Sequence, residues 1–156
     1  MRECAHRLVI NAPPAAVLDA FFDPDALVQW WRVTRAICVP RPFGSYAIEW
    51  APSASPDEVP GGFGGTLHGT VVEFKAGSEF FVADLYWHPA GGGDPIGPMA
   101  LEVTCHMDGF ASVLHVRQSG YDKTSADWTR YYDVMSARWG PALAALKDYL
   151  EARWAD

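Results

Sequence analysis

The sequence has few of the residues that would build a disulfide framework or a structural metal centre. Its 156 residues include three cysteines, Cys4, Cys38 and Cys105, an odd number with no CxxC pair. This argues against a disulfide framework and against a structural zinc site. Cys105 falls in an apolar strand pattern, so we interpret it as a small core residue and not as a nucleophile.

Basic charge is also scarce. The chain has 12 Lys and Arg against 19 Asp and Glu, a formal net charge of -7, and its basic residues form no cluster. Nucleic-acid binding needs a basic face, and a membrane-surface patch needs several adjacent Lys or Arg, so neither partner is expected.

Long hydrophobic runs are absent as well. The longest apolar stretches fall far short of the roughly 20 residues that span a bilayer, which argues against membrane insertion. The first residues, Met1–His6, read directly into a strand pattern without the apolar core of a signal peptide. We therefore expect a cytoplasmic protein.

The histidines do not have the spacing of a metal site. There are five of them, and no two show the i, i+4 helical or HExxH spacing of a zinc enzyme. Because they lie on separate expected strands, we predict no metal and no cofactor. His68 and His88 are the two that could approach the mouth of an interior cavity, and His68 is kept as a candidate ligand-binding residue.

Aromatic residues, in contrast, are plentiful. They make up 13% of the chain and include seven Trp. That is more bulky ring surface than a small core needs, and it favours a lined binding cavity.

The first two thirds of the chain predict one strand, two short helices and then several strands. Residues 6–10 form an apolar strand pattern, and Asp23 followed by Pro24 is typical of a helix start. The later segments alternate between apolar and polar residues with a period of two. The expected helices are 15–22 and 24–30, and the expected later strands are 45–50, 66–74, 79–88, 99–107 and 112–119. Residues 51–65, rich in Pro and Gly, predict an exposed loop.

The last third predicts one long amphipathic helix from about Ser125 to Arg153. Its apolar residues recur every three or four positions, which is the period of a helix face against a core. This stripe consists of Trp128, Tyr132, Met135, Trp139, Leu143, Leu146 and Leu150. Pro141 cannot donate a hydrogen bond to the carbonyl four residues earlier, so we expect a kink or a fresh helix start at Gly140–Pro141.

Three groups of residues resemble a known superfamily. They are Ile10–Val17 with the Leu27–Trp31 segment, His68–Phe74 with the strand that follows, and Gln118–Tyr121 with Trp139–Leu143. Together they are similar to the SRPBCC, or START-like, superfamily of the birch-pollen-allergen fold. Within it they most resemble the branch related to the C-terminal domain of the heat-shock-protein-90 ATPase activator.

The resemblance implies an α+β helix-grip fold in a single domain over residues 1–156. In this fold a curved antiparallel sheet of six or seven strands wraps around a long C-terminal helix, and two short helices follow the first strand. The superfamily includes lipid carriers, hormone receptors, polyketide cyclases and co-chaperone domains, so fold does not decide function. The branch shares no catalytic residue set, and the catalytic residues of this chain stay unknown.

Ligand binding is the function that the sequence favours. A small hydrophobic or aromatic molecule would lie between the sheet and the C-terminal helix, against mostly apolar walls with a few polar groups. The candidate walls are Trp50, Trp87, Trp128, Tyr132, Met135 and Trp139, the polar handles are Gln118 and Tyr131, and His68 is at the mouth.

Two other functions stay open. One is a cofactor-free enzyme of the cyclase or hydrolase type that uses the same cavity. The other is a protein-interaction module of the co-chaperone type. A buried carboxylate or histidine would favour catalysis, and a filled core would favour protein docking. A homodimer is also open.

Overall fold

The fold is described from a computed structural model for residues 2–52 and 64–154. The expected exposed loop at 51–65 therefore falls largely outside the described residues. The elements in chain order are β1 (Arg2–Ile10), α1 (Pro14–Asp19), α2 (Pro24–Trp30), β2 (Arg35–Cys38), β3 (Ser45–Trp50), β4 (Gly65–Lys75), β5 (Glu79–Pro89), β6 (Ile96–Asp108), β7 (Ala111–Tyr121) and α3 (Ala126–Trp154).

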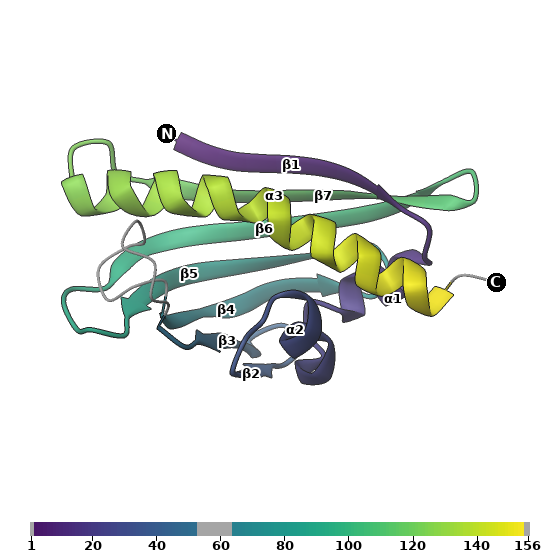
Figure 1. Ribbon diagram of the computed structural model, residues 1–156, viewed down its shortest axis with the longest axis horizontal. Coiled ribbons are helices and arrows are strands. Elements are labelled where there is room, and N and C mark those ends of the chain that lie inside the picture. Colours follow the sequence, from purple (N-terminus) through teal and green to yellow (C-terminus); the bar gives the residue numbers. More distant parts are fainter. Residues whose placement is uncertain (1, 53–63, 155–156) are drawn as a thin grey trace.

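The strands form one seven-stranded antiparallel sheet in the order β1-β7-β6-β5-β4-β3-β2. Figure 1 shows α3 lying across one face of this sheet, with α1 and α2 packed at one end. Alternate strand residues point toward α3, so the inward positions of β4, such as Leu67 and Val71, are buried. The predicted helix-grip architecture is confirmed.

Local sequence explains the two short helices. The Asp23 carboxylate accepts a hydrogen bond from the Asp25 backbone N–H at 3.1 Å, and Pro24 occupies the first helical position of α2. In α1, Pro14 has the same position, but no side chain caps the helix. Both helices bury their apolar sides. They cover the end of the molecule that lies away from the start of α3.

The long helix differs from its prediction in two ways. It continues through Pro141 from Ala126 to Trp154, so the fresh helix start is not observed, although α3 bends about midway in Figure 1. Gly140 and Pro141 are both exposed, so the lost backbone hydrogen bond lies on the solvent side. In addition, the buried stripe begins with Tyr131 and not with Trp128 and Tyr132. Its members are Tyr131, Met135, Trp139, Leu143, Leu146 and Leu150.

One flank of α3 is tied to the edge strand β1. The Tyr132 hydroxyl donates to the Glu3 carbonyl at 3.1 Å, and the Lys147 ammonium donates to the Val9 carbonyl at 2.6 Å. The Glu151 carboxylate accepts from the Asn11 N–H at 2.8 Å. These bonds occupy backbone groups on the open edge of the sheet, which would otherwise be free to pair with another strand.

Within the described ranges, no helix combines the length and the apolar character needed to cross a membrane.

Candidate functional site

A continuous run of aromatic rings lies between the sheet and α3. Trp139 on α3 lies 5.1 Å from Trp31, measured between ring centroids, and Trp31 lies 5.2 Å from Trp50. The run continues from Trp50 to Trp87 at 6.0 Å and from Trp87 to Tyr131 at 5.8 Å. All five side chains are buried. The structure thus brings together Trp50, Trp87, Tyr131 and Trp139 from the predicted set, and Met135 is buried on the same helix face.

Trp31 was not among the predicted wall residues. It links the α3 side of this run, at Trp139, to the sheet side, at Trp50. It follows α2, and its ring stacks on Trp30 at 4.9 Å with an interplanar angle of 9°. Its backbone carbonyl accepts a hydrogen bond from the Trp50 indole N–H at 2.9 Å. The pair of adjacent tryptophans therefore anchors α2 and also supplies an interior ring.

Gln118 is satisfied by its protein neighbours. Its side-chain carbonyl accepts from the Trp139 indole N–H at 2.8 Å, and its amide nitrogen donates to the Tyr131 hydroxyl at 3.2 Å. The same nitrogen lies 3.5 Å from the Met99 sulfur. Burial raises the pKa of Tyr131, against a smaller lowering by the Gln118 hydrogen bond, so the phenol stays neutral. Gln118 thus fixes the positions of two wall residues.

Tyr121 is an interior polar residue that the sequence analysis missed. Its side chain is 4% exposed, and its hydroxyl has no hydrogen-bond partner among the described residues. Simple alternation after Leu114, Val116 and Gln118 would point residue 120 inward and Tyr121 outward. However, Gly120 has a φ of 104°, and the pairing of β7 with β1 shifts register there. This bulge reverses the alternation and turns Tyr121 toward α3.

Trp128 and Tyr132 lie at the start of α3 beside Tyr121 and are half-buried. The Tyr121 ring is 4.7 Å from the Tyr132 ring and 6.3 Å from the Trp128 ring, in edge-to-face arrangements. The Arg2 guanidinium covers the Tyr132 ring at 5.1 Å. These two predicted wall residues therefore border one end of the interior run and are not part of its buried centre.

His68 does not approach the interior. It is exposed on β4 between two buried neighbours, Leu67 and Gly69, so its side chain points to the outer face of the sheet. His88 is exposed in the same way on β5. The placement of His68 at a cavity mouth is a wrong prediction, because the alternation of β4 assigns the inward positions to its apolar neighbours.

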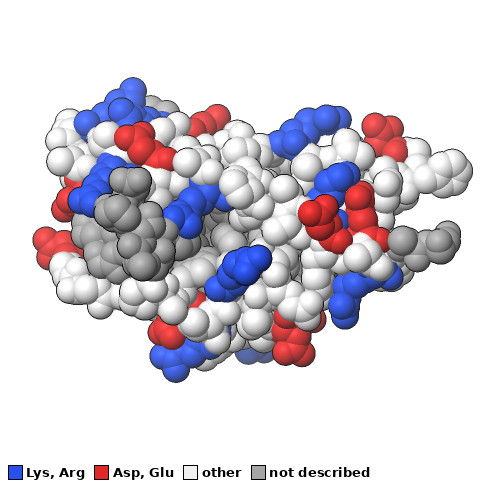
Figure 2. Space-filling model, viewed as in Figure 1, with Lys and Arg blue, Asp and Glu red and all other residues white. Residues whose placement is uncertain are grey.

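Charged side chains stay outside the interior. Among the described residues, the buried polar side chains are Ser112 and Gln118, and no Asp, Glu or His is buried. Figure 2 shows acidic and basic groups interspersed over the face that carries α3. No group of three His, Cys, Asp or Glu side chains within the described ranges lies close enough together to hold a metal ion.

An open depression of about 520 Å³ also lies on the surface at the start of α3. Most of the residues that line it are polar or charged by type, among them Lys123, Arg130 and Asp133. It shares no residue with the buried stripe of α3. It is therefore separate from the aromatic interior and is not the candidate site.

Comparison with solved structures identifies the fold. A structural-genomics protein from Mesorhizobium loti superposes with a TM-score of 0.72 at 20% identity, over 99% of both chains. The Aha1 dimer from Colwellia psychrerythraea gives a TM-score of 0.67 at 15% identity, over 97% of both chains. The chain has a helix-grip fold.

A third helix-grip neighbour is larger. It is a protein from the dynemicin biosynthetic locus, with a TM-score of 0.66 at 16% identity. The match covers 96% of this chain and 47% of that protein. No protein-family model matches the sequence, and a search of the curated proteins finds no match.

Proposed function

We propose that this protein binds a small apolar or aromatic molecule between the sheet and α3. The observation that carries the proposal is the run of five buried rings from Trp139 to Tyr131, whose tilted and edge-to-face contacts give a polarisable, mostly apolar wall. Such walls favour apolar and aromatic ligands, whose rings stack at similar distances. The Trp128 and Tyr132 side chains, only half-buried at one end, mark the side from which a ligand enters.

The absence of buried charge among the described residues supports binding over proton-transfer chemistry. General acid–base catalysis needs a positioned group whose pKa lies near the working pH. Gln118 and Tyr131, the proposed polar handles, are neutral and already bonded to each other. We therefore place the cyclase or hydrolase alternative second.

The narrower relationships remain proposals. We propose that the chain belongs with the branch related to the C-terminal domain of the heat-shock-protein-90 ATPase activator, on the sequence segments that resemble it. A homodimer is proposed on the likeness to the Aha1 structure, which is itself a dimer. Size-exclusion chromatography with light scattering, repeated over a tenfold range of concentration, measures the oligomeric state directly.

The binding proposal is tested by titration with Nile red, an apolar dye whose emission rises in a dry environment. We expect saturable binding to the folded protein and a loss of dye emission when the protein is unfolded in urea. Trp128→Ala should weaken dye binding by about fivefold or more, because it removes a large ring from the entry side.

Trp154→Ala is the matched control. Trp154 is 52% exposed near the end of α3, far along the helix from Trp128, and its removal should leave dye binding unchanged. Equal effects of both substitutions, or no saturable binding by the folded wild type, would contradict the proposal. Native mass spectrometry of the protein purified from cells then identifies the mass of a bound molecule.

A further inference from the structure

A small polar cluster lies at one end of the aromatic interior, between β1, β7 and α3. It consists of the Cys4 thiol, the Ser136 hydroxyl and the Tyr121 hydroxyl, and we call it the polar end. Cys4 is 6% exposed and Tyr121 is 4% exposed. Cys4 pairs across the sheet with Gln118, which holds Tyr131, so the polar end adjoins the last ring of the aromatic run.

Its groups have fewer hydrogen bonds than their burial requires. The hydroxyl oxygens of Tyr121 and Ser136 are inaccessible to solvent and have no partner of acceptable geometry among the described residues. A buried donor without a partner costs about 1–3 kcal/mol, so two of them at one place need an explanation. An acceptor atom within reach of either hydroxyl would remove part of that cost.

Cys4 interacts with both Ser136 and Tyr121. Ser136 lies close enough to Cys4 to lower its pKa, against the larger rise that burial causes. Burial raises the pKa of Tyr121, and its neighbours Tyr131, Cys4 and Tyr132 raise it further. The Tyr121 ring is 4.7 Å from Tyr132 and 6.1 Å from Tyr131.

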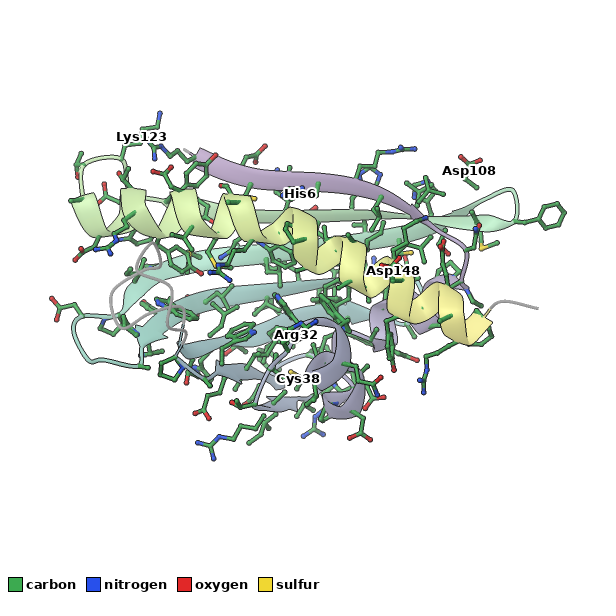
Figure 3. All side chains as sticks on the ribbon, viewed as in Figure 1. His6, Arg32, Cys38, Asp108, Lys123 and Asp148 are labelled. Atoms are coloured by element: carbon green, nitrogen blue, oxygen red, sulfur yellow. The ribbon has the colours of Figure 1, made fainter. Side chains whose placement is uncertain are left out.

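A histidine completes the surroundings. The His6 Nε2 lies 3.3 Å from the Cys4 sulfur, and Figure 3 shows His6 where β1 passes beside α3. Burial lowers the pKa of His6, and it raises the pKa of Cys4 and Tyr121. At neutral pH the thiol, the phenol and the imidazole are therefore all uncharged.

The chemistry of the polar end follows from these properties. Tyr121 and Ser136 each offer an O–H donor, and Cys4 offers a weaker S–H donor. Donors without a charge suit an uncharged oxygen acceptor, because a buried anion would need a cation or several charge-assisted bonds. We infer that the polar end binds the carbonyl oxygen of an aromatic ligand whose rings lie against the tryptophans.

This inference rests on the proposed ligand-binding function and adds the class of ligand: a planar aromatic ketone or a related aryl carbonyl compound. The Tyr121 hydroxyl is its main donor, since it is the most deeply buried of the unpaired groups. Arg2, which lies over the Tyr132 ring at 5.1 Å, is a cation at the same end and makes a carboxylate the alternative that a test must include.

Three probes of nearly the same shape separate these ligands: fluorene, 9-fluorenone and fluorene-9-carboxylate. Dissociation constants are measured by quenching of tryptophan emission, and the ratio of the fluorene to the fluorenone constant is compared between proteins, so that general hydrophobicity cancels. We expect Tyr121→Phe to lower this ratio by about fivefold, the worth of one buried hydrogen bond, while fluorene binds as before. Tyr86→Phe, a half-buried tyrosine of β5, is the matched control and should leave the ratio unchanged.

Two further measurements keep the test independent of how well Tyr121→Phe folds. Ser136→Ala lies on a helix, where alanine is well tolerated, and should lower the ratio by about twofold to fivefold. In the wild type, the infrared carbonyl stretch of bound fluorenone should move to lower frequency than in hexane, because a hydrogen bond weakens the C=O bond.

The outcomes are distinct. An unchanged ratio in Tyr121→Phe and Ser136→Ala, or an unshifted carbonyl stretch, overturns the inference and leaves the binding function standing if fluorene binds. Tighter binding of the carboxylate than of the ketone also overturns it. Failure of all three probes to bind the folded wild type overturns the proposed function, and the inference falls with it.

Discussion

Replacing Gln118 by Met removes the hydrogen bonds that hold two interior rings while it nearly preserves side-chain volume. Trp139 would lose the acceptor of its indole N–H, now at 2.8 Å, and Tyr131 would lose the donor at 3.2 Å. Both residues are almost fully buried, so water cannot replace the lost bonds. Two orphaned groups cost about 2–4 kcal/mol, and relief from burying the amide reduces the net loss to about 1–3 kcal/mol.

A second substitution shows whether these groups act as one unit. In the wild type, Tyr131→Phe removes a hydroxyl that Gln118 bonds, and it should cost about 1 kcal/mol. In the Gln118→Met background the same hydroxyl is already unpaired, so Tyr131→Phe should be neutral or stabilising. The difference between the two values is the coupling free energy of the pair.

Urea unfolding followed by tryptophan emission gives the free energy of unfolding for each of the four proteins. A loss of 1 kcal/mol should also lower Tm by about 2–4 °C in a chain of this length. Gln29, which is exposed on α2, provides the control Gln29→Met, for which we expect a change below about 0.5 kcal/mol. Equal costs of Tyr131→Phe in both backgrounds would refute the coupled arrangement.

Three further predictions concern stability. Leu146 is fully buried on α3, so Leu146→Ala should lower the free energy of unfolding by about 2–5 kcal/mol. The control Val28→Ala, at a 48% exposed position, should cost less than about 1 kcal/mol. A Leu146 cost near the Val28 value would place the helix stripe outside the core. Burial lowers the pKa of His6, so as the pH falls through about 6.5 the unfolded chain takes up a proton that the folded chain does not. Stability should therefore decrease from pH 7 toward pH 5, and His6→Gln should reduce that slope; an identical slope in both proteins would exclude His6 as its source. Incubation with EDTA should leave Tm unchanged, and a lower Tm that zinc restores would reveal a metal site.

The periodicity of the sequence predicts most of the fold. A period of two in the middle of the chain and a period near 3.6 at its end lead directly to the sheet and to α3, because burial acts on whole faces. The helix flanks are harder to assign. Tyr131 and Tyr132 are adjacent, and the spacing from Met135 suits either of them as the preceding core position. The structure buries Tyr131, while the Tyr132 hydroxyl reaches the Glu3 carbonyl on β1, a contact that only the tertiary arrangement creates.

The candidate site was predictable where alternation is regular and not where it breaks. Trp50 and Trp87 follow the inward pattern of their strands, and both are buried. Tyr121 does not, because the bulge at Gly120 changes the side to which the following residue points. A glycine inside a strand pattern is itself a signal for a bulge. Gly120 could therefore have indicated that Tyr121 points inward and is a candidate ligand-binding residue. His68 shows the opposite error, since a titratable side chain was given weight against the alternation of its own strand.

The uncharged interior also limits which residue could act as a base in the enzyme alternative. A cyclase or hydrolase in this fold would need a base near the ligand, and burial keeps both Tyr121 and Cys4 protonated at neutral pH because it raises their pKa values. Burial lowers the pKa of His6, so its imidazole is neutral and can accept a proton beside the Cys4 sulfur, 3.3 Å away. We therefore predict that any proton-transfer activity toward an aryl ketone follows His6, with kcat lost in His6→Gln and ligand affinity kept within about twofold, as expected for loss of a base alone. The rate should rise with pH along the titration of a single group below pH 6.5 and then level off. A rate that is insensitive to His6→Gln, or one that rises with a pKa above 8, would move the base to another group and return Cys4 or Tyr121 to consideration.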